Sequence, residues 1–285
     1  MKQTNITTIS KFSFTIIFFS IVVISSWLAL SQIKKDSQEN IRNALFTVTK
    51  MTKESLDIWI ESQKNNIIDY KKQNETIHLT KKLLNEYHSK KDILNSSTQK
   101  KIRKTIRKKL EEFSFEGYFI IAPDRVSIAS LRNSNIGTIN LIHKYRKKYL
   151  DRAFNGETLF VPTINSDVPL KDSAGVLKEN RATIFIASPI FDNSKNIIAV
   201  LTFRLNPFLD FTRITQLGRI GESGETYAFD KNGLLLTNSR FNEQLEKIGL
   251  ITRNQQGMQS IRIADPGGDM TKGFQPTVSV EKRPL

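Results

Sequence analysis

Cysteine is absent from the 285 residues of this chain, and histidine occurs only three times. Without cysteine there can be no disulfide framework, no cysteine-ligated zinc site and no thiol nucleophile. His78, His88 and His143 form no His-Glu-x-x-His motif, so we expect no metal and no other cofactor. The sequence also shows no nucleophile and base at a useful spacing. A hydrolase, including one anchored in a membrane, is therefore disfavoured, and we predict that the chain is not an enzyme.

Acidic residues are also few. The chain has 43 Lys and Arg against 28 Asp and Glu, which gives a formal net charge of +15. Residues 81–110 alone contribute +9 of this charge. A local basic excess can indicate nucleic acid binding. Hydrophobic residues make up 39% of the chain and charged residues 25%, which is typical of a folded protein and not of general disorder.

One long segment carries no charge at all. Residues 12–33 are apolar or uncharged over 22 positions, and a helix of this length spans about 33 Å, the thickness of a bilayer core. The alternative is a cleaved signal peptide, but the apolar run is longer than usual and no clear cleavage site follows it. We predict a transmembrane helix in contact with the lipid bilayer.

Positive charge lies on both flanks of this span, with Lys11 before it and Lys34-Lys35 after it, so the short head is used to assign the orientation. The head, residues 1–11, carries Lys2 and Lys11 and no acid, so we place it in the cytoplasm and residues 36–285 outside. The sequence predicts a protein of the cell (inner or plasma) membrane that crosses it once. An extracytoplasmic segment meets no chromosome, so nucleic acid is not an expected partner.

Proline and glycine are absent from residues 36–113, and we predict a long helical stalk over this range. Apolar residues such as Ile41, Leu45 and Val48 recur at helical spacing. Pairing of this stalk with that of a second chain predicts a homodimer.

The lysines and arginines between Ile102 and Leu110 form a basic helix face. We interpret it as a solvated surface. The alternatives are contact with anionic lipid or an acidic wall polymer, as in an adhesive protein.

After residue 113 the sequence takes on β character. Residues 118–123 and 126–131 predict one hairpin, and residues 182–192 and 196–206 predict a second. A strand is expected at 157–164, a helix near 140–154 and a polar loop at 165–181. Asn206 and Pro207 resemble an N-cap and first-turn proline for a helix over 206–221. The simplest packing is a helix-backed antiparallel sheet, which predicts the α+β class.

Residues 225–265 repeat the same order of predicted elements, a hairpin followed by a helix and a strand. Strands are expected at 225–230, 234–239 and 260–265, with a tight turn at Lys231-Asn232-Gly233 and a helix at 241–251. The hairpin predicted at 182–192 and 196–206 has no counterpart in this second set of elements. We therefore divide the exterior into a stalk at 36–113, a membrane-distal module at 114–210 and an incomplete membrane-proximal module at 211–285.

Residues 218–241, GRIGESGETYAFDKNGLLLTNSRF, resemble the membrane-proximal half of a double Cache sensor region. The shared features are the lead-in Gly218-x-x-Gly221-Glu-Ser-Gly, Tyr227 in the following strand, and the turn from Asp230 to Gly233. The anchor, the long helix and the second hairpin agree with the resemblance, which covers about residues 36–285. It implies two PAS-like modules, with a small-molecule ligand in the distal one. The family normally closes the second module and adds a second span, so we expect a fragment or a truncated reading frame.

A PAS-like sheet curves around a cavity, so polar groups on its strands and loops are candidates for ligand binding. The candidate residues are Tyr118, Ser127, Ser130, Arg132, Asn135, Tyr145, Arg181, Thr183, Phe185 and Asp192. Arg132 can hold a carboxylate or phosphate in a bidentate contact, or it is a surface or loop-capping residue. Tyr145 is either an aromatic wall of the cavity or a helix packing residue.

The second hairpin leaves similar alternatives open. Arg181, Thr183 and Phe185 alternate along one strand face, which lines the cavity or faces solvent. Asp192 holds a ligand ammonium or caps a turn. The subset of the family that binds amino acids carries an Arg-x-Trp-aromatic motif. The only tryptophans here are Trp27 and Trp59, so an amino acid ligand is not predicted.

These features predict extracytoplasmic small-molecule sensing by a membrane-anchored receptor of the signal-transduction type. The alternative is an anchored extracytoplasmic binding protein without its own output domain. In the first case, the ligand shifts the sheet against the stalk helix and the shift reaches the cytoplasm.

Overall fold

The structure, a computed structural model, describes residues 3–171, 175–222, 224–253, 255–268, 272–279 and 282–283, with side chains from residue 14 onward. The chain divides into two compact units, Met1–Met51 and Thr52–Leu285. The two units are described separately below.

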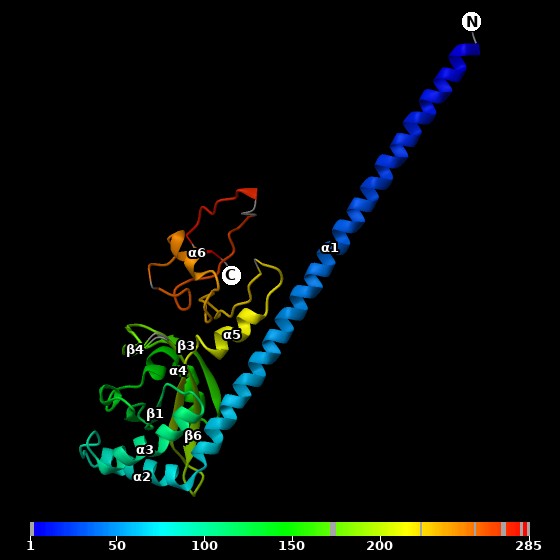
Figure 1. The fold of residues 1–285 in the computed structure, drawn as a ribbon. Helices are drawn as coiled ribbons and strands as arrows, with labels where there is room; N and C mark the ends of the chain where they lie inside the picture. Colours follow the sequence, from blue (N-terminus) through cyan, green and yellow to red (C-terminus); the bar gives the residue numbers. More distant parts are fainter. Residues whose placement is uncertain are drawn as a thin grey trace. The chain divides into compact units, whose positions relative to one another are not determined.

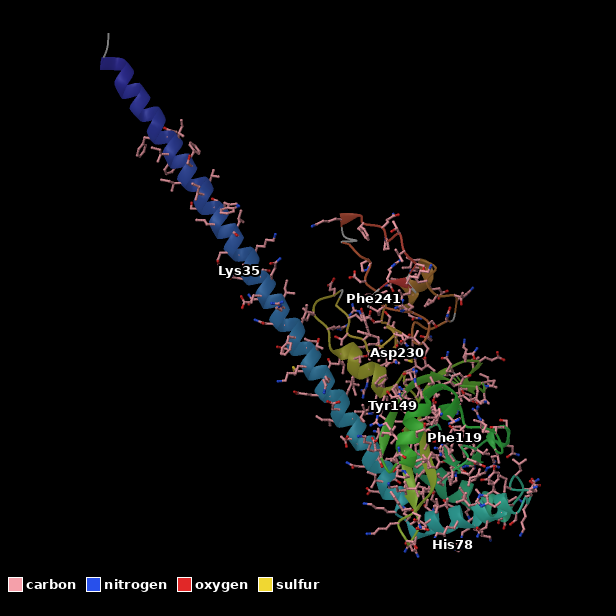
Figure 2. The ribbon with its side chains drawn as sticks, turned by 180° about the vertical axis from the view of Figure 1, so that it is seen from behind. Lys35, His78, Phe119, Tyr149, Asp230 and Phe241 are labelled. Carbon is pink, nitrogen blue, oxygen red and sulfur yellow. The ribbon has the colours of Figure 1, made fainter. Side chains whose placement is uncertain are left out.

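The first unit consists of the N-terminal part of helix α1, which runs from Gln3 to Lys71. One stretch of this helix is long and apolar enough to cross a membrane. Its large side chains, among them Phe19 and Trp27, are exposed, and the side chains around Lys35 stand out from the helix (Figure 2). By length and composition the stretch agrees with the predicted span.

In the second unit, the helical segment differs from the predicted continuous stalk. Helix α1 ends at Lys71, and two separate helices follow, α2 (Asn74–His88) and α3 (Ser97–Glu112). The physical reason is burial. Leu83 of α2 and Ile106 of α3 are fully buried, and the two helices can both place such residues on the sheet only if the chain turns between them. Ser96 caps α3 by accepting a 3.0 Å hydrogen bond from the backbone nitrogen of Gln99.

A five-stranded antiparallel sheet forms the centre of this unit (Figure 1). Its strands lie in the order β2-β1-β7-β6-β3. They are β1 (Gly117–Ile121), β2 (Ser127–Ser130), β3 (Leu159–Asn165), β6 (Ala182–Phe191) and β7 (Ile197–Leu205). Both predicted hairpins are confirmed. The loop expected at 165–181 contains a short pair in addition, β4 (Leu170–Lys171) with β5 (Leu177–Lys178).

The sheet separates two hydrophobic cores. On one face, Ile120 and Ile186 pack with residues of α1, α2 and α3. On the other, Phe119 and Phe185 pack with residues of α4 (Leu141–Phe154). Helices on both faces of one antiparallel sheet confirm the predicted α+β class. A short 3-10 helix, η1 (Asn133–Asn135), connects β2 towards α4.

The helix expected at 206–221 is shorter than predicted and begins later. It is α5 (Asp210–Leu217). The Asn206 side chain accepts a 3.0 Å hydrogen bond from the backbone nitrogen of Phe208, so it caps a turn that precedes the helix. The interpretation of Asn206 as the helix N-cap is therefore wrong. The local hydrogen bond of an Asn side chain serves a turn as well as a helix start.

The three strands predicted after residue 224 are extended segments joined by single bridges. Phe229 pairs with Leu235, and Leu234 pairs with Arg262. Pairings of so few strands are marginal without further neighbours in the sheet. The predicted turn is present: Gly233 has φ +78° and its nitrogen donates to the carbonyl of Asp230 at 2.8 Å. The helix expected at 241–251 is α6 (Asn242–Lys247). The division into two modules at residue 211 stays a prediction.

Candidate functional site

The face of the sheet that packs against α4 carries a group of polar residues at one end. Thr202 and Arg204 lie two residues apart on β7 and therefore on the same face. Thr202 is paired across strands with Phe119, which also pairs with Ser130. Arg204 is paired with Phe185. Phe119, which is labelled in Figure 2, thus lies between Ser130 and Thr202 on this face of the sheet.

Arg204 is the central residue of this group. Its side chain is 5% exposed, and its guanidinium lies 5.3 Å and 5.4 Å from the ring centroids of Phe119 and Phe185. Among the described residues, its Nε has no hydrogen-bond partner and no acidic side chain forms an ion pair with it. Burial and, to a smaller extent, the positive charge of Arg132 lower the pKa of Arg204 to about 10. The charges of Glu116 and Asp167 act in the opposite direction, but neither carboxylate forms an ion pair with Arg204, so the buried cation has no anion in direct contact among the described side chains.

Other polar groups of the same face lie near it. The hydroxyl of Thr202 is buried and has no partner within the described part of the chain. Thr183 donates to the carbonyl of Leu205 at 3.5 Å, and the Ser130 hydroxyl accepts from the backbone nitrogen of Arg132 at 3.3 Å. Thr202 and Arg204 therefore offer polar groups that the protein itself leaves unused.

The loop that contains β4 and β5 is tied to this end of the sheet by two arginines. Arg132 donates from Nη1 to the carbonyl of Pro169 at 2.7 Å. Arg181 donates to the carbonyl of Lys171 and pairs with Glu116 at 3.1 Å. Arg132 follows β2 and Arg181 precedes β6, so both contacts hold the loop next to the ends of these strands.

Five of the predicted residues thus meet on one sheet face or at its end. They are Ser130, Arg132, Arg181, Thr183 and Phe185. The side-chain alternation along β6 predicted the last three as a group, and the structure brings them together. Thr183 and Phe185 are fully buried and Arg181 is 9% exposed, so the alternative that these side chains face solvent is wrong.

Tyr118 and Ser127 have structural surroundings. Tyr118 is buried in the core formed with α1, α2 and α3, on the opposite face from Arg204, and burial raises its pKa. The reason is strand alternation, which turns Tyr118 and Phe119 to opposite faces. The Ser127 hydroxyl accepts a 2.9 Å hydrogen bond from Asn140, which caps α4.

The remaining three candidates lie apart from this group. Asn135 is buried in η1, where its carbonyl accepts from the Thr138 hydroxyl at 3.0 Å. Tyr145 is 57% exposed on α4. Asp192 accepts from the backbone nitrogens of Ser194 and Asn196 at 2.9 Å and 2.8 Å. Asp192 therefore caps the β6–β7 turn, which is the alternative reading of this residue.

Sequence reasoning missed Arg204 and Thr202, although a signal for them was present. The strand IIAVLTFRL places Thr202 and Arg204 on one face and Leu201 and Phe203 on the other. An arginine inside a continuous apolar strand is uncommon unless it is paired. In the described ranges, no group of three or more His, Cys, Asp or Glu side chains could hold a metal ion.

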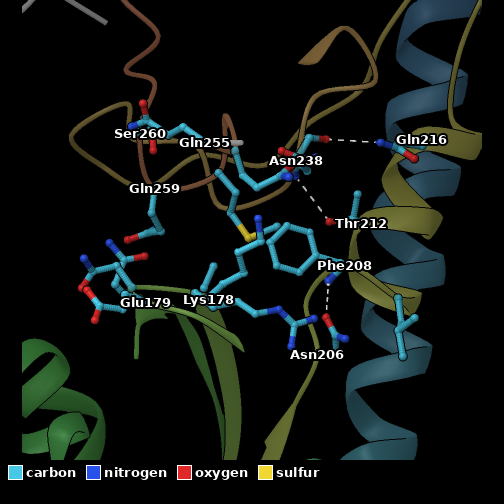
Figure 3. A pocket seen from close by; sticks show the side chains of 17 residues that line it. Lys178, Glu179, Asn206, Phe208, Thr212, Gln216, Asn238, Gln255, Gln259 and Ser260 are labelled. Carbon is cyan, nitrogen blue, oxygen red and sulfur yellow. Dashed lines mark hydrogen bonds between the residues drawn. The ribbon is translucent and has the colours of Figure 1, made fainter. Parts of the chain in front are cut away.

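A cavity of about 1070 Å³ lies beside this site, at the N-terminal end of β6. Of the predicted residues, Arg181 lines it. Figure 3 shows Lys178, Glu179 and Asn206 on one side of the cavity and Asn238, Gln255 and Gln259 on the other.

No protein-family model matches the chain, and no curated protein matches it. Several solved structures resemble its fold. The sensor domain of the V. cholerae histidine kinase DctB is 16% identical, with a TM-score of 0.45 and 74% of each chain covered. The ligand-binding domain of the Campylobacter jejuni chemoreceptor Tlp3, in complex with 4-methylisoleucine, is 12% identical, with a TM-score of 0.37 and 75% of each chain covered.

The ligand-binding domain of Mlp24, with asparagine, is also 12% identical, with a TM-score of 0.32 and coverage of 74% of this chain and 82% of that one. The first of these is a sensor domain, and the other two are ligand-binding domains. At these identities and TM-scores the likeness concerns the fold alone. The function is argued below from the residues of this chain.

Proposed function

We propose that this chain is the membrane-anchored, extracytoplasmic sensing part of a receptor, and that its distal module binds a small anionic molecule at Arg204. The observation that carries the proposal is the buried guanidinium of Arg204, which has no acidic partner among the described side chains. A non-catalytic role is part of the proposal.

The energetics favour an anion as ligand. An unpaired buried charge costs several kcal/mol unless a counter-charge compensates it. The charge of Arg132 also contributes to the lowered pKa of Arg204, so the two cations repel each other, and the charges of Glu116 and Asp167 offset part of this repulsion. A carboxylate or phosphate near Arg204 would remove both penalties, and the Thr202 hydroxyl could donate to it. The rings of Phe119 and Phe185 would exclude water from the contact.

The signal would leave the module through α1. Ile67 and Tyr70, near the end of this helix, lie in the same hydrophobic core as residues of the sheet. The ring of Trp59 lies 6.2 Å from that of Phe160 on β3 and 6.0 Å from that of Phe211 on α5. A ligand that favours one arrangement of the sheet would therefore shift the helix packed on it. In this proposal the N-terminal part of α1 lies in the bilayer.

The same helix is the proposed dimer contact. Ile41, Leu45 and Phe46 are 56%, 52% and 69% exposed, and side chains at such spacing form a stripe that a second stalk helix can cover. The absence of cysteine allows a clean test, because Leu45→Cys would be the only thiol in the chain. Disulfide formation between two copies in membranes would support the dimer. A Leu45→Cys chain that stays entirely monomeric under oxidising conditions would contradict the dimer.

Binding is tested with the full chain in lipid nanodiscs by titration calorimetry. The probes are succinate, malate, citrate, glutamate and phosphate. We expect saturable binding of at least one of them, and a loss of about 100-fold or more in affinity for Arg204→Met. Arg213→Met is the matched control, because Arg213 is a mostly exposed arginine. Binding that survives Arg204→Met, or no binding of any probe, would overturn the anion site.

A second measurement separates the receptor from the alternative, an anchored binding protein without its own output. In the receptor, a saturating anion changes the rate of disulfide formation at Leu45→Cys, because the ligand shifts α1. In the alternative, the anion binds but the rate of disulfide formation stays unchanged.

Labelling of Asn193→Cys from outside the cell with an impermeant maleimide tests the orientation. Protection of this exposed turn residue would contradict an extracytoplasmic module.

A further inference from the structure

The cavity beside the anion site differs from it in chemistry. Its volume of about 1070 Å³ is slightly above the roughly 300–1,000 Å³ typical of small-molecule sites. The walls come from the end of β3, the start of β6, the chain from Asn206 to Gln216, and residues 238–260. All of them belong to the second unit.

Carboxamide side chains dominate the walls: eight of the seventeen lining residues are Asn or Gln. The charged residues are Lys178, Glu179 and Arg181, and the charge of Arg181 is compensated by its ion pair with Glu116. The cavity is therefore close to neutral, in contrast to the surroundings of Arg204. Each carboxamide both donates and accepts hydrogen bonds, which matches ligand groups that do the same.

Asn238 has a polar atom that the protein leaves without a partner. Its Nδ2 donates to Oε1 of Gln256 at 2.7 Å, and its backbone carbonyl accepts from Gln216 at 3.4 Å. Its Oδ1 is buried and accepts no hydrogen bond from the residues that the structure describes. A buried acceptor without a donor costs about 1–3 kcal/mol. Since Asn238 lines the cavity, a small rotation of its side chain would bring Oδ1 to a ligand hydroxyl, and the hydrogen bond would remove this cost.

An apolar surface completes the cavity. The ring of Phe208 lies between the two amide-lined sides (Figure 3), and Met258 also lines the wall. The guanidinium of Arg181 lies 5.3 Å from the Phe208 ring centroid. An aromatic ring next to paired donors and acceptors suits a molecule with an apolar C–H face and a rim of hydroxyls.

We propose that this cavity binds a neutral polyhydroxylated ligand, a short oligosaccharide, as a site separate from Arg204. An extended peptide would be expected to add to the edge of a strand, whereas the walls here are side chains of loops, α5 and strand ends. The proposal does not depend on the anion site.

The test uses the full chain in nanodiscs and titration calorimetry with maltose, cellobiose and di-N-acetylchitobiose. Triglycine and succinate are run in parallel. We expect saturable binding of at least one saccharide, and a loss of about tenfold or more for both Asn238→Leu and Phe208→Ala. Asn193→Ala, which alters an exposed carboxamide in the β6–β7 turn, is the matched control and should bind as the natural chain does.

Each outcome decides the proposal. No binding of the three saccharides, binding of triglycine in their place, or saccharide binding that Asn238→Leu and Phe208→Ala leave unchanged would overturn it. If Asn238→Leu does not fold, Gln216→Leu replaces it, because Gln216 lines the same cavity from α5. Arg204→Met should bind the saccharide normally and lose succinate if succinate binds, so the failure of one site is distinguishable from the failure of the other.

Discussion

Arg146 and Asp230 join α4 to the turn of the C-terminal segment. The Nη2 atom of Arg146 lies 3.9 Å from Oδ2 of Asp230, and it also donates to the carbonyl of Thr163 at 2.8 Å. The Thr163 hydroxyl in turn donates to the carbonyl of Leu236 at 2.8 Å. Arg146 has non-helical backbone angles inside α4, φ −137° and ψ 44°. The kink therefore lies at the residue that makes the connection.

Removing this connection should weaken the packing of residues 225–239 on the sheet. We expect Arg146→Met to lower the free energy of unfolding by about 1–3 kcal/mol, because Asp230 loses its ion-pair partner and the carbonyl of Thr163 loses a donor. The control is Lys147→Met, which alters an exposed residue of the same helix. Denaturant unfolding and limited proteolysis of the full chain measure the effect. Equal stability of the two variants would contradict the contact.

A second prediction concerns the opposing effects of Arg204 on stability and binding. In the folded chain its pKa is lowered to about 10, so the protonated form is less favoured there than in the unfolded chain. The destabilisation is present at every pH below the folded pKa. Arg204→Met should therefore raise the stability of the ligand-free chain by about 1–3 kcal/mol, equally from about pH 5 to about pH 9.

The measurement is the melting temperature of the full chain in detergent, with and without the anion that binds. The natural chain should gain stability with the anion, and Arg204→Met should gain none. A ligand-free Arg204→Met that melts lower than the natural chain would show that the rings of Phe119 and Phe185 compensate the charge fully. The argument for an anion would then fail.

The strands of the two hairpins between residues 117 and 205 could be predicted from the sequence because local patterns determine them. Alternation of apolar residues on either side of Asp124 and of Asn193 predicted the β1–β2 and β6–β7 hairpins. The end of α1 at Lys71 could not be predicted in this way. No proline or glycine marks it, and the turn follows from burial of α2 and α3 on a sheet that forms later in the chain.

The candidate site was predictable only in part, for a related reason. Alternation groups Arg181, Thr183 and Phe185 on one face of β6, but it does not say which helix covers that face. Tyr118 was chosen for its residue type and lies on the opposite face from Arg204. The side chains that line the cavity from residues 238–260 come from irregular segments, whose position depends on contacts such as that of Arg146 with Asp230.

Asp192 gives a third prediction, which separates a turn role from ligand binding. Hydrogen bonds from the backbone nitrogen and side chain of Asn196 lower the pKa of Asp192, so its carboxylate supports the turn above its unfolded pKa. This support is lost as the pH falls through the lower folded pKa. Asp192→Ala should lower the melting temperature at pH 7 by about 2–4 °C and leave anion binding unchanged. Weaker binding in calorimetry would assign Asp192 to the ligand site.

Lys71, the last residue of α1, gives a prediction about alkaline pH. It is partly buried near Phe191, with Nζ 5.3 Å from the ring centroid. Burial and, to a smaller extent, the charge of Lys72 lower its pKa from 10.5 to about 8. Below about pH 8 the proton is bound in both states, and folding must bury the charge. Between about pH 8 and pH 10.5 the unfolded chain binds the proton and the folded chain does not.

Stability therefore rises with pH across this window through Lys71, because the slope follows the excess of protons bound in the unfolded state. Lys71→Met removes the charge at every pH, so it should melt higher than the natural chain at pH 7, and the difference should shrink towards pH 10. Tyrosines titrate in the same window, so the two chains are compared at each pH. Lys72→Met, at the exposed neighbouring residue, is the control. A constant difference between Lys71→Met and the natural chain from pH 7 to pH 10 would show that Lys71 keeps an ordinary pKa and that the end of α1 is packed less closely on the sheet.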